Sequence, residues 1–291
     1  MLVVLFWGVN WPIMKLGVQY MTPLWFAATR MFLGLLFLFG LLAFQGRLRL
    51  PARADKTILI SIAIIQIAFP TALIHSGLLH LGAGRSAVLV FTMPLWVAPL
   101  AFFFLKERIS AVKLTGLSLG LAGVAALFNP MAFDFTDQSQ LIGNGFMLIA
   151  SFSFATAIIL VRRNPSAAPI IQLVPWQLFL GSVLLAIAAL SIEGTPDVQW
   201  SSSLVAIMAY NGPIASGFCF WAYLTVSSNL PAMNTAIGSL GIPVIGVISS
   251  AFILGESLNL SVVSGLVLIL LGILAVNLND LRRSEPSNPL K

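Results

Sequence analysis

The 291-residue sequence contains little charge and only one cysteine. Charged residues make up 8% of it, hydrophobic residues make up 59%, and the mean hydropathy is +1.00. A soluble domain is about one-quarter charged, so this composition excludes one and predicts a membrane protein. The single cysteine, Cys219, excludes an internal disulfide framework and a multi-cysteine metal site. The net charge of +6 does not predict nucleic-acid binding, because the basic residues fall in short gaps between apolar runs.

Acidic side chains are missing from the middle of every long apolar run. All 9 Asp and Glu residues lie in gaps or at the ends of runs. A carboxylate inside the membrane is the usual carrier of protons and the usual partner of a cationic drug. The sequence therefore disfavours proton-coupled export of drug cations. We also expect no metal and no cofactor.

Ten apolar segments are present, each close to the roughly 20 residues that cross a bilayer. Met1 is followed directly by the first of them with no basic region, so we expect that segment to be retained rather than cleaved. The turns between segments are marked by Pro, Gly, Ser, Asn and charge, and none is long enough for a soluble domain. The segments are residues 2–19, 23–45, 57–80, 84–105, 111–128, 141–162, 169–192, 202–227, 231–254 and 260–279.

Lysine and arginine concentrate in alternate gaps, which gives the expected orientation. The gap after the second segment carries Arg47, Arg49 and Arg53, whereas the opposite set of gaps holds only Lys15 and Arg85. Basic gaps stay in the cytoplasm. We therefore expect a multi-pass protein of the cell (inner) membrane with both termini cytoplasmic.

The sequence repeats itself with opposite expected orientations. At an offset of 149 residues, Pro94 aligns with Pro243 and Glu107 with Glu256; at an offset of 147, Gly34 aligns with Gly181. Each copy holds five segments, and five crossings reverse the side of entry. We predict an all-α integral membrane fold of ten transmembrane helices, as an inverted five-plus-five repeat around a central cavity. Residues 1–130 form the first copy, 138–280 the second, and 281–291 a cytoplasmic tail.

Several short motifs give the sequence a resemblance to a known family. They are Trp7-Gly8-Val9-Asn10-Trp11 with Lys15, Pro23 with Arg30, Ser86 through Pro94 to Leu105-Lys106-Glu107-Arg108, then Gly116 and Gly123, and in the second copy Thr235, Pro243, Leu254-Gly255-Glu256 and Gly265. With them the chain resembles the drug/metabolite transporter superfamily, in its ten-span branch with two EamA-type repeats. The exporters of aromatic and other neutral amino acids are the most similar branch. The resemblance covers nearly the whole chain and implies transport, but it is weak for the substrate.

Aromatic, thioether and amide side chains dominate the interior positions of the segments. A chamber lined in this way suits a solute with a flat apolar part and a small polar head, although any one ring could instead serve packing. The predicted substrate-binding residues are Trp7, Asn10, His75, Phe91, Met93, Trp96, Phe154, Trp221 and Ser239. Pro94 and Pro243 each free a backbone carbonyl near the middle of a segment, and we predict that they act as hinges.

Four polar residues, Arg30, His75, Glu107 and Glu256, are each interpreted in structural terms. Arg30 is the one clear mid-segment cation, which is too few for a phosphate; a cation bonded to backbone carbonyls or packed along its helix is favoured over a substrate contact. His75 is more typical of a hydrogen-bonded packing residue than of a proton carrier. Glu107 and Glu256 precede segments that begin near Ser110 and Asn259, and we interpret both as structural acids that complement the helix dipole, with Ser110 or Asn259 as the cap. Gly116, Gly120, Gly123, Gly265 and Gly272 favour close packing of the fifth and tenth segments, or a dimer contact.

The sequence therefore favours an exporter of small neutral or zwitterionic metabolites, with aromatic or hydrophobic amino acids first. It would work by alternating access, as a facilitator in the absence of a buried acid. Its expected partners are the amino-acid substrate and the lipid bilayer, with no nucleic acid, and the choice between monomer and homodimer stays open. The alternatives are export of other solutes, such as nucleosides or nonpolar drugs, and an intramembrane enzyme built on Ser239 and His75.

Overall fold

The computed structural model describes residues 1–107, 110–128, 137–257, 263–272, 274 and 275, and the expected tail at 281–291 lies outside them. In these ranges the chain is helical, apart from turns and an isolated bridge between Met21 and Val198. The helices are α1 (Leu2–Gly17), α2 (Pro23–Phe44), η1 (Arg53–Asp55), α3 (Lys56–Ile62), η2 (Ala63–Ala68), α4 (Phe69–Gly77), α5 (Ala83–Val90), α6 (Pro94–Leu100), η3 (Ala101–Leu105), α7 (Ala111–Phe128), α8 (Gln138–Arg163), α9 (Ile170–Ile192), α10 (Ser202–Tyr210), η5 (Asn211–Phe218), α11 (Cys219–Asn229), α12 (Ala232–Ser239) and α13 (Gly241–Leu254), followed by the helix Val263–Gly272.

Seven helical stretches of the described chain are long and apolar enough to cross a membrane. They are Pro23–Phe44, Arg53–Gly77, Ala83–Leu105, Gln138–Arg163, Ile170–Ile192, Ser202–Asn229 and Ala232–Leu254. Three further apolar helices, at Leu2–Gly17, Ala111–Ala126 and Val263–Gly272, are shorter. The chain is thus an all-helical, multi-pass membrane protein, and its helices begin and end close to the bounds expected from the sequence.

Prolines interrupt four of these stretches. The third and eighth expected segments contain the π-helical turns η2 and η5, next to Pro70 and at Pro213. The fourth segment is broken after α5 by the turn at residues 91–93, and α6 starts at Pro94. The ninth is broken at Leu240, with Pro243 in the first turn of α13. A proline donates no backbone hydrogen bond, which explains why the helical ladder is irregular at these places.

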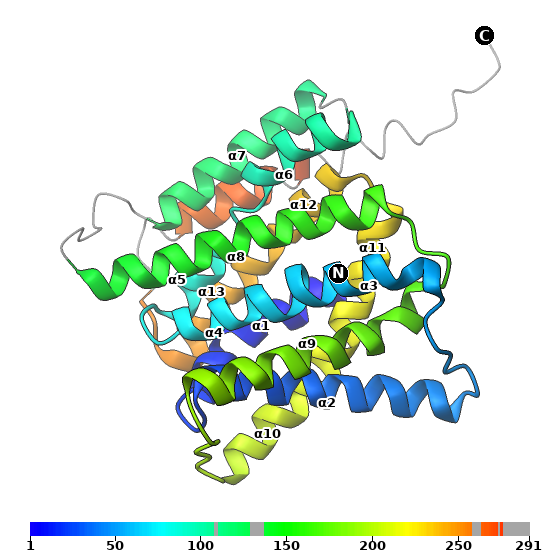
Figure 1. Ribbon diagram of the computed structural model, residues 1–291. Helices are drawn as coiled ribbons and strands as arrows, with labels where there is room; N and C mark the ends of the chain where they lie inside the picture. Colours follow the sequence, from blue (N-terminus) through cyan, green and yellow to red (C-terminus); the bar gives the residue numbers. More distant parts are fainter. Residues whose placement is uncertain (108–109, 129–136, 258–262, 273, 276–291) are drawn as a thin grey trace.

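The helices pack side by side, and many neighbours come from different halves of the sequence (Figure 1). α2 lies along α9 and against η5, α1 lies along α13, and α4 lies along α8. Glycines permit the closest approaches. A Cβ added at Gly34 would lie 2.9 Å from Gly217 N in η5, and one at Gly181 would lie 2.5 Å from the Ile67 side chain in η2. Aligned glycines of the two copies therefore contact corresponding segments of the opposite copy.

The fifth segment packs tightly on the tenth, as the glycine pattern predicted. A Cβ at Gly123 would lie 2.6 Å from Gly265 O, and one at Gly272 would lie 2.6 Å from Gly116 O. In the repeat, Gly116 aligns with Gly265 and Gly123 aligns with Gly272. The second contact is therefore the first contact with each glycine replaced by its repeat partner. Small residues here let the backbones of α7 and the helix Val263–Gly272 touch.

Four carboxylates in the gaps cap helices of the other half of the chain. Ala232 N–H donates to Glu107 Oε1 at 3.0 Å, and Ala83 N–H donates to Glu256 Oε1 at 2.9 Å. Asp55 accepts from the N–H groups just before α9, and Glu193 accepts from those at the start of α2. Carboxylates stabilise helix N-termini by satisfying their free N–H groups.

These contacts give Glu107 and Glu256 partners that the sequence did not indicate. Glu107 caps α12 and Glu256 caps α5, while residues 108–109 and 258–262, which follow them, lie outside the described residues. Ser110 accepts from Lys113 N–H at the start of α7, and Asn259 lies outside the described residues. The sequence pattern indicated the chemistry but not the partner, because the partner is a tertiary neighbour.

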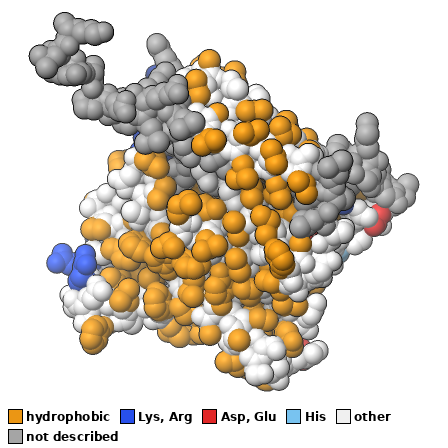
Figure 2. Space-filling model, turned by 180° about the vertical axis from the view of Figure 1, so that it is seen from behind, with side chains coloured by type: hydrophobic (Ala, Val, Ile, Leu, Met, Phe, Trp, Pro, Cys, Tyr) orange, Lys and Arg blue, Asp and Glu red, His pale blue; other side chains and the backbone are white. Residues whose placement is uncertain are grey.

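The outer surface is apolar. Hydrophobic side chains spread across the face in Figure 2, and the few charged side chains coloured there lie at its edges. Exposed apolar side chains come from every part of the bundle, among them Phe32, Phe103, Ile187 and Phe252. Such a face is stable against lipid and not against water, which agrees with a membrane location.

Candidate functional site

A cavity lies at the centre of the bundle, between helices of both halves. Its aromatic lining is Trp7, Trp11, Phe91, Phe154, Phe220 and Tyr223. Its aliphatic and thioether lining is Met14, Met31, Ile74, Val90 and Met93. Its polar lining is Asn10, Arg30, Thr71 and His75.

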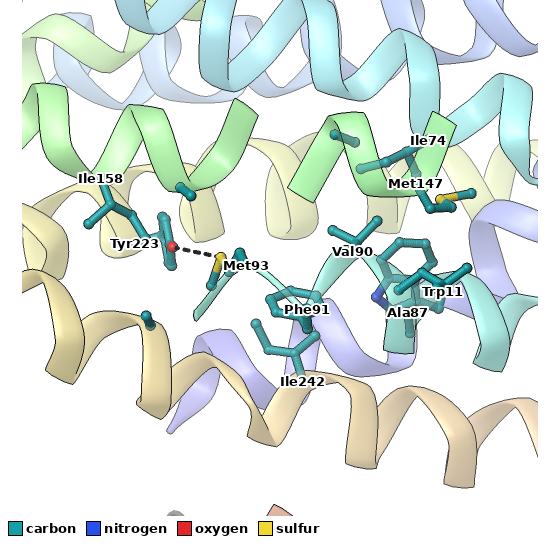
Figure 3. Close-up of a cluster of buried hydrophobic side chains, with 14 of the residues drawn as sticks. Trp11, Ile74, Ala87, Val90, Phe91, Met93, Met147, Ile158, Tyr223 and Ile242 are labelled. Atoms are coloured by element: carbon teal, nitrogen blue, oxygen red, sulfur yellow. Dashed lines mark hydrogen bonds between the residues drawn. The ribbon is translucent and has the colours of Figure 1, made fainter. Parts of the chain in front are cut away.

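The cavity is narrow in this conformation. Its volume is ≈ 60 Å³, whereas small-molecule sites commonly have about 300 Å³ or more. A solute the size of an amino acid would require the surrounding helices to move apart. The break in the fourth segment borders the cavity: Figure 3 shows Val90, Phe91 and Met93 at the break, with the Tyr223 hydroxyl directed at Met93 Sδ, 3.9 Å away.

Arg30 is buried, with 4% of its surface exposed, and reaches the cavity from α2. Its Nε donates to Ser216 Oγ at 3.0 Å, and its Nη1 donates to Met14 Sδ at 2.7 Å. Nη1 also lies 3.4 Å from His75 Nε2. These partners are uncharged side chains and not the backbone carbonyls that the sequence interpretation favoured. Its repeat counterpart, Gln177, lies outside the lining.

His75 is held between Arg30 and its own helix. Its Nδ1 lies 2.7 Å from Thr71 O, which accepts only, so Nδ1 carries the proton. Nε2 then has a free lone pair and accepts from Arg30 Nη1. In this arrangement His75 accepts from the guanidinium and orients it.

Aromatic rings gather around Trp7 in the first half of α1, whereas Arg30 contacts Met14 in the second half. Trp7 Nε1–H donates to Ala215 O in η5 at 2.8 Å, which fixes the indole. The ring meets Phe220 edge-on at 5.4 Å and Tyr223 at 5.0 Å between centroids. These contacts connect the first copy of the repeat to the second and present ring faces and edges to the cavity.

Asn10 has an unused acceptor. Its side chain is 2% exposed and lines the cavity, and its Oδ1 has no hydrogen-bond partner among the described residues. A buried amide oxygen without a partner costs free energy, so such groups commonly mark a place where a ligand or water binds.

The structure brings six of the nine predicted binding residues to this cavity: Trp7, Asn10, His75, Phe91, Met93 and Phe154. The other three are not part of the lining. Trp96 is 37% exposed and packs edge-on against Phe152. Trp221 packs against Phe218, and Ser239 donates to Thr235 O within its own helix.

The sequence interpretation missed several lining residues. Thr71 lies four residues before His75, and Met14 lies four residues after Asn10, so helical spacing around each polar residue would have found both. Phe220 lies four residues after the buried Ser216, so the same spacing would have found it as well.

The arrangement gives no support for hydrolytic chemistry. The Ser239 hydroxyl donates to Thr235 O, and both nitrogens of His75 are engaged by Thr71 and Arg30. In the part of the chain that the structure describes, no group of three or more His, Cys, Asp or Glu residues could hold a metal ion. The cavity is suited to binding a solute.

Comparisons with known proteins show which transporters the chain is similar to. The transporter YvbV of Bacillus subtilis (strain 168), which is described as uncharacterized, is 30% identical over 94% of this chain and 88% of its own. A probable amino-acid metabolite efflux pump of Escherichia coli (strain K12) is 28% identical over 97% of this chain and 94% of its own. A solved structure described as "Crystal structure of protein" has a TM-score of 0.74 at 17% identity and covers 99% of this chain and 98% of its own, which concerns the fold alone.

The profile of the EamA-like transporter family matches the sequence twice, at residues 1–129 and 141–278. These two matches account for most of the chain. The protein is a membrane transporter and not an enzyme, and it belongs to the EamA-like transporter family.

Proposed function

We propose that this transporter exports neutral amino acids, aromatic and hydrophobic ones first, through the central cavity. The observation that carries the proposal is the lining, in which aromatic rings surround a small group of polar side chains. Rings stack on an apolar side chain, and the polar group holds a zwitterionic head. The printed name of the Escherichia coli relative, a probable amino-acid metabolite efflux pump, supports the same substrate class.

The proposed architecture is ten spans in two inverted copies, residues 1–130 and 138–280. Reciprocal contacts support it: Gly123 meets Gly265 while Gly272 meets Gly116, and Glu107 caps α12 while Glu256 caps α5. In each pair of contacts, the residues of one contact are the repeat partners of the residues in the other. Such pairs are typical of two copies that are related by a two-fold axis. Because each copy has five spans, the axis would lie in the membrane plane. The basic gaps favour cytoplasmic termini in the cell (inner) membrane.

Alternating access is the proposed mechanism, with hinges at Pro94 and Pro243. Both prolines lie within three residues of a helix break, at matching positions of the two copies. The narrow cavity requires movement of the lining helices before a solute enters. No acidic side chain lines the cavity in the described chain, which supports a facilitator that runs downhill without proton coupling.

Counterflow in liposomes tests the proposed function. Purified protein is reconstituted with an internal excess of unlabelled tryptophan, phenylalanine or threonine, and uptake of the same labelled amino acid is measured without an ion gradient. We expect transient accumulation, strongest for tryptophan and phenylalanine. Uridine and a nonpolar dye are measured in parallel. Transport of uridine with none of the three amino acids would overturn the proposal in favour of a nucleoside carrier.

A further inference from the structure

The cavity contains a buried cation whose protein contacts are all uncharged. Arg30 donates from Nε and Nη1 to Ser216, Met14 and His75. Its Nη2 forms no hydrogen bond with any residue that the structure describes, and no carboxylate pairs with the guanidinium there. A buried charge is costly without a counter-charge. The free Nη2 donors at the cavity therefore match an anionic group supplied by the solute.

The charge of the guanidinium favours a carboxylate. The two N–H donors of Nη2 are the ones left for a solute, because Nε and Nη1 are engaged by protein side chains, and one Arg balances one negative charge. A phosphate would need further cations, and Arg30 is the one Lys or Arg in the described lining. Arg30 is therefore suited to a solute with a single carboxylate.

The unpaired acceptor of Asn10 is complementary to an ammonium group. Its Oδ1 is buried, partner-free among the described residues, and part of the same lining. An ammonium group donates hydrogen bonds and accepts none. A neutral acceptor at this point satisfies the ammonium without adding a negative charge that would compete with the carboxylate for Arg30.

The face of α1 sets the order of these groups. Trp7, Asn10 and Met14 lie at positions i, i+3 and i+7, so they share one face of the helix. Arg30 Nη1 lies 2.7 Å from Met14 Sδ, which puts the guanidinium about one turn, or ~5.4 Å, beyond Asn10. Trp7 lies about one turn away on the other side, with Phe220 and Tyr223 around it.

We propose that Arg30 binds the α-carboxylate of the transported amino acid, that Asn10 accepts from its α-ammonium group, and that the side chain points along α1 to the rings around Trp7. His75 is a positioning residue, because its Nε2 holds the guanidinium in place. The inference deepens the proposed function and rests on it, since it concerns the same cavity. It predicts that the transporter requires both charges of the zwitterion on its substrate.

The test is competition against labelled tryptophan in the counterflow assay. The competitors are unlabelled tryptophan, tryptophanamide, which lacks the carboxylate, and indole-3-propionate, which lacks the ammonium group. We expect tryptophan to compete at least about tenfold better than either analogue, the effect of losing one charge-assisted contact. In Arg30→Gln the advantage over tryptophanamide should fall to about onefold, because no cation is left to select the carboxylate.

Two further variants keep the test decisive. Arg162→Gln is the matched control, since Arg162 donates to Ser228 O away from the cavity, and it should retain the wild-type selectivity. If Arg30→Gln does not fold, Asn10→Leu is used instead, and it should lose the advantage of tryptophan over indole-3-propionate. Wild-type protein on which tryptophanamide and indole-3-propionate both compete as well as tryptophan would overturn the inference but leave amino-acid export intact. Absence of tryptophan counterflow in wild type would instead overturn the proposed function.

Discussion

The carboxylate of Glu256 accepts hydrogen bonds from the first backbone N–H groups of α5, from Ala83 at 2.9 Å and from Gly84 at 3.2 Å. Its repeat partner, Glu107, forms the corresponding contact with Ala232 at the start of α12. Each half of the chain thus caps a broken helix of the other half. These helices lead to the breaks at residues 91–93 and at Leu240, and the first of the two breaks borders the cavity.

Replacing Glu256 by alanine should destabilise the protein by removing two acceptors from the N-terminus of α5. Helix caps of this kind contribute about 0.5–2 kcal/mol, and the negative charge adds a favourable interaction with the helix dipole. We expect a lower midpoint of thermal unfolding in detergent, measured by the fluorescence of the tryptophans. Glu256→Gln keeps an acceptor but loses the charge, and it should lie between alanine and wild type. An unchanged midpoint in Glu256→Ala would contradict the capping role.

Glycine at position 123 should be essential for the contact between the fifth and tenth segments. A Cβ there would lie 2.6 Å from Gly265 O, a backbone atom that cannot rotate away. We expect Gly123→Ala to cost about 1–3 kcal/mol through forced separation of the helices. Gly145→Ala is the control, because a Cβ at Gly145 meets no atom within 4 Å and alanine favours helix. Equal unfolding midpoints for the two variants would exclude the close helix contact.

The helix bounds were predictable from the sequence, but the inward face of each helix was only partly so. Long apolar runs and Pro, Gly or charged gaps define where a span begins and ends, and α2 and α9 agree with the expected bounds to within one residue at each end. In a membrane, however, the lipid-facing and buried sides of a helix are both apolar. The hydrophobic period that identifies the core face of a soluble helix is therefore weak.

A polar residue one turn away in the same helix explains why some of the predicted binding residues line the cavity. Trp7 has Asn10 one turn away, and His75 has Thr71 one turn away, so the inward face is marked at both places. Trp96 has Thr92 four residues before it, but the turn at residues 91–93 separates the two, and Trp96 is 37% exposed on α6. The contacts of Glu107 and Arg30 could not be predicted either, because their partners come from segments far away in the sequence.

Trp7 should contribute to transport, whereas Trp96 should not. Trp7 lines the cavity and is held by Ala215 O, and Trp96 is exposed on α6. Trp7→Ala removes aromatic contacts that contribute about 0.5–1.5 kcal/mol each, in addition to the effect of the buried area. We therefore expect the half-saturation concentration for tryptophan to rise about tenfold. Trp96→Ala removes the same side chain without touching the cavity and should leave counterflow unchanged. A similar loss in both variants would mean that the cavity is not the binding site.

The rate of transport should not depend on pH in the range in which histidine ordinarily titrates. Protonation of His75 Nε2 would remove the acceptor for Arg30 and put a second cation 3.4 Å from Nη1. We therefore expect a flat counterflow rate from about pH 5.5 to 7.5. His75→Gln keeps a side chain that can accept from Arg30, so it should retain a flat profile with weaker tryptophan binding. A rate that changes across this range in wild type and becomes flat in His75→Gln would establish His75 as a proton carrier.

Pro94 should determine the rate of transport more than the affinity. It lacks the N–H that would reach Val90 O across the break, and it lies at the start of α6 beside the cavity. Pro94→Ala restores that donor and favours a continuous, stiffer helix through residues 91–93. We expect the maximal counterflow rate to fall severalfold, because hinge residues act on the conformational step. The half-saturation concentration for tryptophan should stay within about twofold of the wild-type value. Pro99→Ala changes an exposed proline inside the same helix and is the matched control. An equal effect of the two substitutions, or a change confined to the half-saturation, would contradict the hinge role of Pro94.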